Sequence, residues 1–127
     1  MSQRRDAVGE TLWETPAGKL EPGESPAACA ERELREETGY AAERWTAACE
    51  FYTTPGFSNE RITLFVAEEL SRVQRPDDDE IDQVRAVSID DAASMIESGD
   101  IRDAKTILAI LHRIATSDPR DREGDGA

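Results

Sequence analysis

Three glutamates at helical spacing are the residues of this chain best suited to do chemistry. Glu33, Glu36 and Glu37 stand at positions i, i+3 and i+4 of one short segment. On an α-helix this spacing places the three carboxylates on one side, where like charges repel, near the helix end that disfavours anions. With no other evident charge partner, the cluster indicates a bound cation, and oxygen-only ligands favour Mg²⁺ or Mn²⁺. The alternative interpretation is a solvated acidic helix face.

Capping residues on either side of the glutamates predict the helix that positions them. Ser25 followed by Pro26 is typical of an N-cap and a first helical position, and Gly39 is typical of a C-terminal stop. We therefore predict a helix over residues 26–38. A neighbouring face of this helix carries small and apolar side chains that can pack against a sheet, namely Ala27, Ala30 and Leu34.

A longer pattern surrounds this helix. Residues 18–40 read GKLEPGESPAACAERELREETGY, in which five residues separate Gly18 from Glu24 and seven separate Glu24 from Arg32. This segment resembles the Nudix hydrolase box, and every defined position of the family pattern matches. The resemblance implies an α/β fold, a Nudix-like α/β/α sandwich with a mixed sheet. It also implies metal-dependent hydrolysis of a small nucleoside diphosphate derivative.

Four further segments resemble the ADP-ribose pyrophosphatase branch of the family. They read TPAGKLEPGE at 15–24, YTTPGFSNE at 52–60, DDDEI at 77–81 and GDIRDAKT at 99–106. Pro55 lies fifteen residues after Tyr40, where this branch carries its marker proline. A plain turn at Pro55 and Gly56 is the alternative. The resemblance implies cleavage of ADP-ribose to AMP and ribose 5-phosphate, with Mg²⁺ or Mn²⁺ as cofactor, by a homodimer.

The resemblance also implies roles for the residues of the box. Glu33 and Glu37 are the preferred metal ligands, and Glu36 is a further one. The backbone carbonyl of Ala17 is an additional ligand. Arg32 is expected to pair with Glu24 and to orient its carboxylate, which places both residues in the catalytic machinery.

Outside the box, the resemblance implies a catalytic base in the acidic loop at 77–80. Glu80 is the first choice and Asp79 the next, and a solvated acidic loop is the alternative. The residues expected to contact substrate are those of the loop that begins at the marker proline: Pro55, Gly56, Phe57, Ser58 and Glu60. For Phe57 the alternative is a packed side chain.

Composition restricts the partners. The net charge of −13 argues against a nucleic-acid backbone and against an anionic membrane surface. No apolar run approaches the roughly 20 residues of a membrane span, and the first residues carry no apolar signal core. Two cysteines are too few for a disulfide framework, so we expect a reducing cytoplasmic setting. Cys29 is expected to be a small packed residue rather than a nucleophile.

The remaining pattern predicts the other elements. We expect strands at 8–15, 45–54, 61–67 and 83–89, a polar loop at 71–79 and a helix at 90–98. Asp103 is expected to cap a last helix. The apolar stripe of that helix comprises Ala104, Ile107, Leu108, Leu111 and Ile114. His112 lies off this stripe, which predicts an exposed histidine.

The domain organisation follows from these elements. Residues 1–116 are expected to form one Nudix domain, and the charged residues 117–127 a disordered tail. Only 17 residues precede Gly18, fewer than in ADP-ribose pyrophosphatases, so we expect the sheet to lack N-terminal strands.

Two alternative functions stay open. One is hydrolysis of another nucleoside diphosphate sugar, and the other is a non-catalytic, ADP-ribose-binding regulatory domain. Regulatory relatives tend to lose the box glutamates, which this chain keeps.

Overall fold

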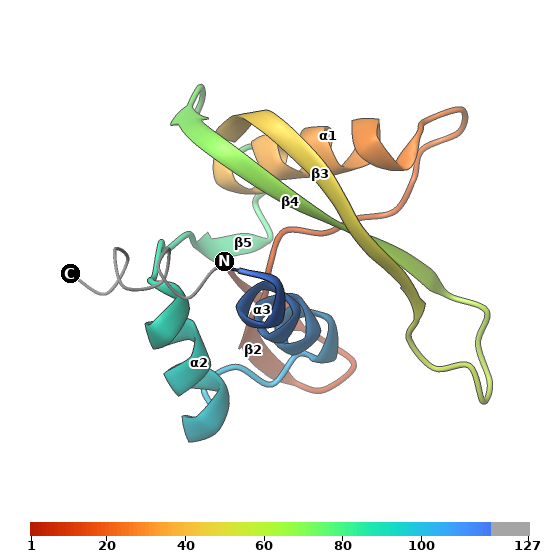
Figure 1. The fold of residues 1–127 in the computed structure, drawn as a ribbon, viewed down its shortest axis with the longest axis vertical. Helices are drawn as coiled ribbons and strands as arrows, with labels where there is room; N and C mark the ends of the chain where they lie inside the picture. Colours follow the sequence, from red (N-terminus) through yellow and green to blue (C-terminus); the bar gives the residue numbers. More distant parts are fainter. Residues whose placement is uncertain (118–127) are drawn as a thin grey trace. The chain divides into compact units, whose positions relative to one another are not determined.

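The computed structural model describes residues 1–117, which divide into two compact units (Figure 1). Among the described residues, the terminal unit comprises Met1–Thr15 and 80–117, and the central unit comprises Pro16–Asp79. The tail predicted at 117–127 lies outside the described residues except for Ser117, whose N–H donates to the carbonyl of Arg113 and closes the last helix.

The terminal unit contains a three-stranded antiparallel sheet in the order β2-β1-β5. The strands are β1 (Ser2–Arg5), β2 (Glu10–Trp13) and β5 (Ile81–Gln83). The prediction of a single strand over 8–15 is therefore confirmed only for residues 10–13, because residues 8–9 belong to the turn between β1 and β2. Gly9 takes φ +71° there, and its N–H donates to the carbonyl of Arg5. The polar sequence of β1 carries no apolar pattern by which it could have been predicted.

The strand predicted over 83–89 is wrong. Strand β5 ends at Gln83, and residues 84–88 form no helix or strand. Val84 and Val87, which suggested the strand, are each 39% exposed, so no sheet face buries them. Ser88 instead caps the next helix, α2 (Ile89–Ser98), because its Oγ accepts the N–H of Asp91. That helix agrees with the prediction for 90–98.

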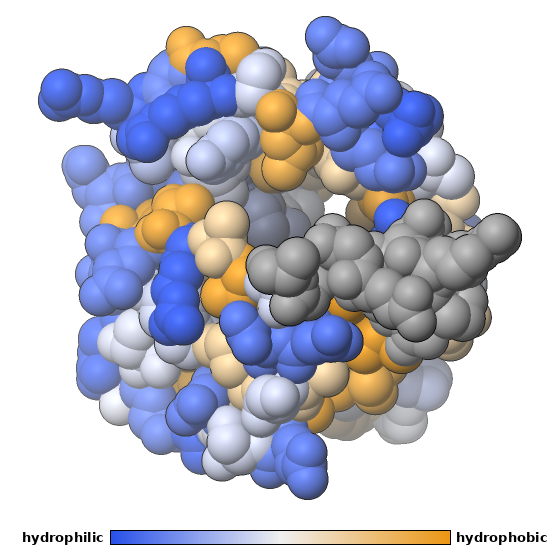
Figure 2. Space-filling model, turned by 60° about the vertical axis from the view of Figure 1, so that its left-hand side comes forward, coloured by the Kyte–Doolittle hydropathy of each residue, from blue (hydrophilic) through white to orange (hydrophobic). Residues whose placement is uncertain are grey.

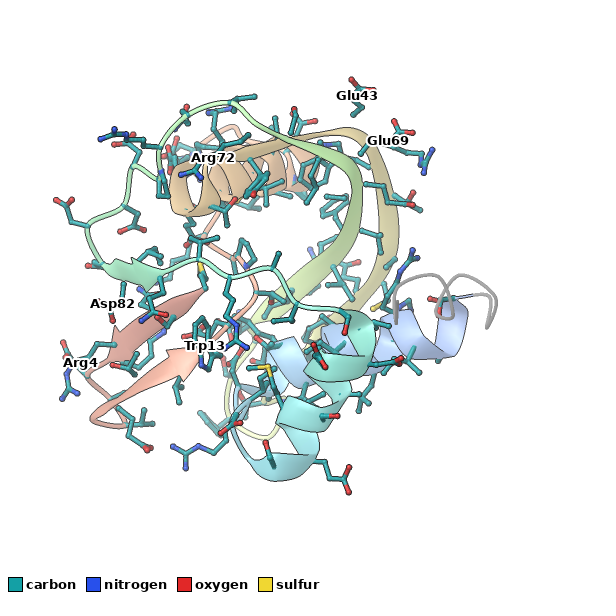
Figure 3. All side chains as sticks on the ribbon, turned by 90° about the vertical axis from the view of Figure 1, so that its left-hand side faces the viewer. Arg4, Trp13, Glu43, Glu69, Arg72 and Asp82 are labelled. Atoms are coloured by element: carbon teal, nitrogen blue, oxygen red, sulfur yellow. The ribbon has the colours of Figure 1, made fainter. Side chains whose placement is uncertain are left out.

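The core of the terminal unit lies under α2 and the last helix, α3 (Ala104–Thr116). Ala92, Ile101 and Ile110 are buried there, and Trp13 from β2 packs against them. Figure 3 shows Trp13 pointing inward from its strand while Arg4 points outward. Asp103 caps α3 as predicted, since its carboxylate accepts the N–H of Thr106.

The buried face of α3 differs from the predicted stripe. Ile107, Ile110 and Ile114 face the core, whereas Leu111 is exposed. The prediction that His112 is exposed is also wrong. The side chain is half-buried, and its Nδ1 is shielded from solvent with no hydrogen-bond partner among the described residues. The helix is rotated relative to the predicted stripe because Ile110, not Leu111, meets Ala92 and Ile101.

The central unit consists of α1 (Pro26–Thr38) and a long antiparallel hairpin of β3 (Tyr40–Tyr52) and β4 (Arg61–Arg72). Helix α1 has the predicted bounds, with Ser25 Oγ accepting the N–H of Ala28. Both strands are longer than predicted, because the polar stretches next to α1 pair with each other from Tyr40 opposite Arg72 onward. The side chains of Glu43 and Glu69 point outward from the curved hairpin (Figure 3).

Gly39 joins the helix, the hairpin and the acidic loop. It takes φ +80°, and a Cβ there would lie 2.3 Å from the carbonyl oxygen of Gln74, so only glycine fits. Its own carbonyl accepts the N–H of Val73, and the N–H of Asp77 donates to the carbonyl of Glu36 at 2.6 Å. The loop after β4 is thereby attached to the C-terminal end of α1.

The α/β class is confirmed, and every strand pair in the described residues is antiparallel. Among the described helices, none is long and apolar enough to cross a membrane. On the face that Figure 2 shows, hydrophobic side chains are interspersed with many hydrophilic ones.

Candidate active site

Arg32 is the centre of the acidic cluster in the central unit. Its Nε and Nη2 donate to the two carboxylate oxygens of Glu24 at 2.8 and 3.0 Å. Its Nη1 donates to Glu33 Oε1 at 2.8 Å and to Glu36 Oε2 at 3.1 Å. Glu21 lies 3.7 Å from the same Nη1. One guanidinium therefore contacts four carboxylates, and the expected pair with Glu24 is among these contacts.

The pairing of Arg32 with Glu24 has a clear electrostatic effect. Hydrogen bonds from the Arg32 side chain, helped by one from the backbone N–H of Glu21, lower the pKa of Glu24 to about 2. The same bonds raise the pKa of Arg32 above its ordinary value. Both groups therefore stay charged at neutral pH.

Two of the box glutamates, Glu33 and Glu37, lie against the loop that precedes α1. Glu37 is buried, and its Oε2 accepts the N–H of Ala17 at 3.0 Å. A Cβ on Gly18 would lie 2.2 Å from Oε1 of Glu33, so the missing side chain makes the space that this carboxylate occupies. The backbone at 17–18 and the carboxylates of Glu33 and Glu37 are thus brought together.

The structure corrects the inference that the glutamates lack a charge partner. Glu33 and Glu36 are paired with Arg32, so their mutual repulsion is already partly relieved. Within residues 1–117, no group of three or more Asp, Glu, His or Cys side chains is arranged to hold a metal ion as it stands. Repulsion between the carboxylates on α1 therefore does not by itself require a cation. The argument for a metal depends on the oxygen ligands that these residues can supply.

The residues expected to act as base lie in different units. Glu80 is exposed and belongs to the terminal unit, where its Oε2 accepts a hydrogen bond from Gln3 Nε2 at 3.2 Å. Asp79 is exposed and ends the central unit. An amide donor to Glu80 holds its side chain in place without neutralising it.

The loop expected to contact substrate is ordered by its own hydrogen bonds. Thr53 Oγ1 donates to Glu60 Oε1 at 2.6 Å, and the N–H of Glu60 donates to Ser58 Oγ. The N–H groups of Phe57 and Ser58 both donate to the carbonyl of Thr54, which closes the turn around Pro55 and Gly56. The Phe57 ring is 86% exposed, so the alternative of a packed Phe57 is wrong.

Cys29 is packed, as predicted. Its side chain is buried, and its Sγ lies 3.6 Å from the carbonyl oxygen of Gly18. Burial raises the pKa of its thiol, with the negative charge of Glu24 adding to the effect. A thiol held protonated is a poor nucleophile.

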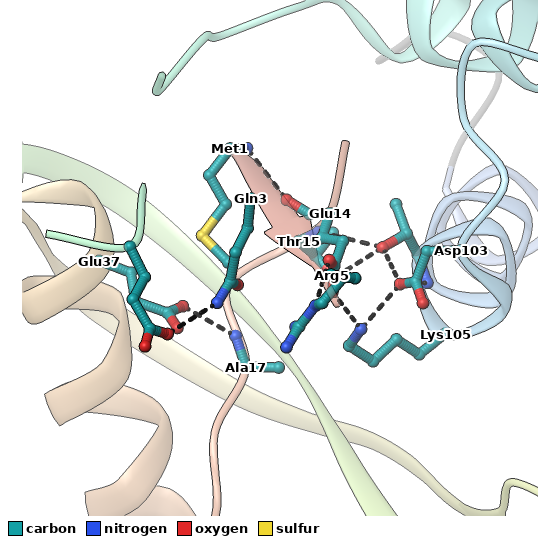
Figure 4. A network of polar contacts seen from close by, with 11 residues as sticks. Met1, Gln3, Arg5, Glu14, Thr15, Ala17, Glu37, Asp103 and Lys105 are labelled. Carbon is teal, nitrogen blue, oxygen red and sulfur yellow. Dashed lines mark hydrogen bonds and ion pairs between the residues drawn. The ribbon is translucent and has the colours of Figure 1, made fainter. Parts of the chain in front are cut away.

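Sequence reasoning missed a second charged cluster, in the terminal unit (Figure 4). Glu14 is 4% exposed and accepts two hydrogen bonds at 2.8 Å from Arg5 and one at 2.6 Å from Lys105. Lys105 also donates to Asp103 at 2.9 Å, and the Asp103 carboxylate accepts the hydroxyl of Thr106. The one signal in the sequence was the family-like segment 99–106, which contains three of these residues.

Opposing effects set the pKa values in this second cluster. Burial alone would raise the pKa of Glu14, but the hydrogen bonds from Arg5 and Lys105 outweigh it, so the pKa is lowered. Burial would lower the pKa of Lys105, but its bonds to Glu14 and Asp103 raise it. The cluster is therefore charged on both sides at neutral pH.

Known structures share this arrangement of elements. A crystal structure of an ADP compounds hydrolase superposes with a TM-score of 0.78 at 23% sequence identity, covering 90% of this chain and 62% of that one. That likeness shows the fold, which is the α/β class that the sequence predicted.

The family follows from the sequence matches. The NUDIX domain family model matches residues 1–110, so the chain belongs to the Nudix family. It is 46% identical over 115 residues to an ADP-ribose pyrophosphatase of Bacillus subtilis (strain 168), covering 88% of this chain. It is 39% identical over 106 residues to a GDP-mannose pyrophosphatase of Cronobacter sakazakii (strain ATCC BAA-894), covering 80% of this chain. The chain spans 62% and 54% of the length of these two relatives.

Proposed function

We propose that this chain is a metal-dependent hydrolase of nucleoside diphosphate derivatives that cleaves ADP-ribose to AMP and ribose 5-phosphate. The observation that carries the proposal is the complete box, folded so that Glu33 and Glu37 lie against the backbone of Ala17 and Gly18. The identity to an ADP-ribose pyrophosphatase supports the choice of substrate.

The donor set fits a hard divalent cation. The carboxylates of Glu33, Glu36 and Glu37 and the carbonyl of Ala17 would hold Mg²⁺ or Mn²⁺, which both prefer oxygen ligands. The absence of a side chain at Gly18 leaves room for the Glu33 carboxylate beside the loop backbone. When bound, the metal would supply charge relief on the diphosphate and a more acidic water. Arg32 would keep Glu24 ionised and oriented at the edge of the site.

Residues outside the box complete the proposed reaction. Glu80, or Asp79 in its place, would take a proton from the attacking water as a general base. The exposed ring of Phe57 and the polar groups of Ser58 and Glu60 would contact the substrate, on a turn that Pro55 and Gly56 shape. A cytoplasmic setting fits the two cysteines, which are both free. The homodimer stays a prediction, which light scattering of the purified protein tests.

A product assay tests the substrate. The purified protein with Mg²⁺ is offered ADP-ribose, GDP-mannose and other nucleoside diphosphate sugars, and products are separated by ion-exchange chromatography. We expect AMP and ribose 5-phosphate as the preferred products. GDP-mannose is the second candidate, because a GDP-mannose pyrophosphatase is 39% identical to this chain over 106 residues. Binding of ADP-ribose without cleavage of any compound would instead indicate the regulatory alternative.

The choice of base is tested separately. Glu80→Gln should lower kcat by roughly 10²-fold or more and leave metal affinity unchanged, as expected for a general base. Asp79→Asn is the matched comparison, because it removes the neighbouring charge. If only Asp79→Asn lowers kcat, the base is Asp79, and if neither does, the base lies elsewhere.

A further inference from the structure

The two edges of the Arg32 guanidinium contact different groups. Nε and Nη2 bind the carboxylate of Glu24, and Nη2 also donates to the carbonyl of Lys19 at 3.2 Å. Nη1 contacts the outer residue Glu21 and, at hydrogen-bond distance, only Glu33 and Glu36. The first edge is therefore attached to the loop before α1, and the second edge to two of the proposed metal ligands.

The Glu33 oxygen bound by Nη1 is the one that faces the loop backbone. Oε1 of Glu33 accepts from Nη1 at 2.8 Å, and the same atom lies 2.2 Å from the position of a Cβ on Gly18. A cation that binds Glu33 through Oε1 must share or take over this oxygen. Glu36 meets the same competition at Oε2.

We propose that Arg32 is a counter-ion of the box glutamates: its Nη1 releases Glu33 and Glu36 when a divalent cation binds, while its Nε and Nη2 stay bound to Glu24. This proposal rests on the metal site of the proposed function.

Charge favours the exchange. One guanidinium faces the carboxylates of Glu21, Glu24, Glu33 and Glu36, so the cluster keeps an excess of negative charge. A divalent cation brings twice the charge and binds carboxylate oxygens directly. The two bonds of Arg32 to Glu24 form a planar fork, which holds the arginine in place without the help of Nη1.

Metal binding by a variant without the arginine tests the proposal. Arg32→Gln should bind Mn²⁺ about 5- to 30-fold more tightly than the unaltered chain, because one or two partly exposed ion pairs no longer compete. Arg35→Gln is the matched control, since Arg35 is an exposed arginine one turn away on the same helix. Mn²⁺ affinity is measured by the electron paramagnetic resonance signal of the free ion, starting from metal-free protein.

The opposite role gives the opposite result. If Arg32 only orients the ligands, Arg32→Gln will bind Mn²⁺ more weakly, and the proposal fails. It also fails if Arg32→Gln and Arg35→Gln tighten binding equally, because general electrostatics would then explain the effect. Failure of the unaltered chain to bind Mn²⁺ would overturn it as well. Mn²⁺ binding without hydrolysis of any nucleotide would overturn the proposed function alone.

A measurement on the unaltered chain avoids dependence on the folding of a variant. In ¹⁵N nuclear magnetic resonance spectra, Mg²⁺ should shift the Arg32 Nη1 signal and speed the solvent exchange of its protons, while the Nε–H signal stays protected by Glu24. Simultaneous loss of protection at both nitrogens, or at neither, would contradict an exchange limited to one edge.

Discussion

The two charged clusters of this chain differ in balance. In the terminal unit, the carboxylates of Glu14 and Asp103 face the cations of Arg5 and Lys105, and the Glu14 side chain is 1% exposed. In the central unit, the single cation of Arg32 faces the carboxylates of Glu21, Glu24, Glu33 and Glu36. A buried carboxylate with balanced charges around it holds structure together, whereas a cluster with excess negative charge is suited to a cationic ligand.

The balanced cluster should show the largest effect on stability. Glu14→Gln removes the charged carboxylate that Arg5 and Lys105 share and should lower the free energy of unfolding by about 2–4 kcal/mol. This is below the loss for a fully buried pair, because Arg5 is 43% exposed. Urea denaturation measures the change. Glu10→Gln is the control, since Glu10 begins the strand β2 that precedes Glu14 and pairs with Arg102 at the surface. If Glu14→Gln and Glu10→Gln lower the free energy of unfolding equally, the buried cluster around Glu14 is no more stabilising than a surface ion pair.

The unbalanced cluster should affect activity rather than stability. Glu37→Gln removes a proposed metal ligand and should lower kcat on the order of 10²-fold. Its side chain can still accept the N–H of Ala17, so the unfolding free energy in EDTA should change by less than about 1 kcal/mol. Steady-state kinetics at saturating Mg²⁺ and urea denaturation give the two values. Near-full activity would show that the ligand assignment is wrong.

Lowering the pH should reduce the stabilising effect of both clusters. The folded pKa of Glu24 is about 2, below its ordinary value of 4.5, so its stabilising effect is complete above pH 4.5 and is lost as pH falls toward 2. The pKa of Glu14 is also lowered, which gives the same sign. Stability measured from pH 6 to pH 2 should therefore fall, and Glu24→Gln should make the fall less steep. If Glu24→Gln leaves the slope of stability against pH unchanged, the hydrogen bonds from Arg32 to Glu24 do not contribute to stability as we infer.

A surface ion pair should show the smallest effect. Arg44 pairs with Glu68 and Glu69 across the hairpin, where its side chain is exposed. Arg44→Ala should change the free energy of unfolding only slightly and leave kcat unchanged, because the pair is exposed to solvent. Thermal denaturation at low and high salt checks this, because salt should remove most of the difference. A larger loss would show that charge balance at the surface contributes more than we infer here.

Short-range signals in the sequence were sufficient for part of this protein. The bounds of α1 follow from Ser25, Pro26 and Gly39, and the start of α3 follows from Asp103, because caps act within one turn of the chain. The spacing of Gly18, Glu24 and Arg32 indicated the family, which the match over residues 1–110 shows. These features depend on neighbours a few residues away, which a sequence displays directly.

Only the tertiary structure decided which charges meet. Glu14 and Lys105 are 91 residues apart, and no local pattern pairs them. The exposure of Val84 and Val87 and the burial of Ile110 in place of Leu111 depend on which faces the folded elements cover. Even inside the box, spacing placed the glutamates on one side of α1 but did not show that Arg32 holds two of them. Spacing along a helix restricts where side chains point, whereas pairing depends on rotamers that the surrounding chain selects.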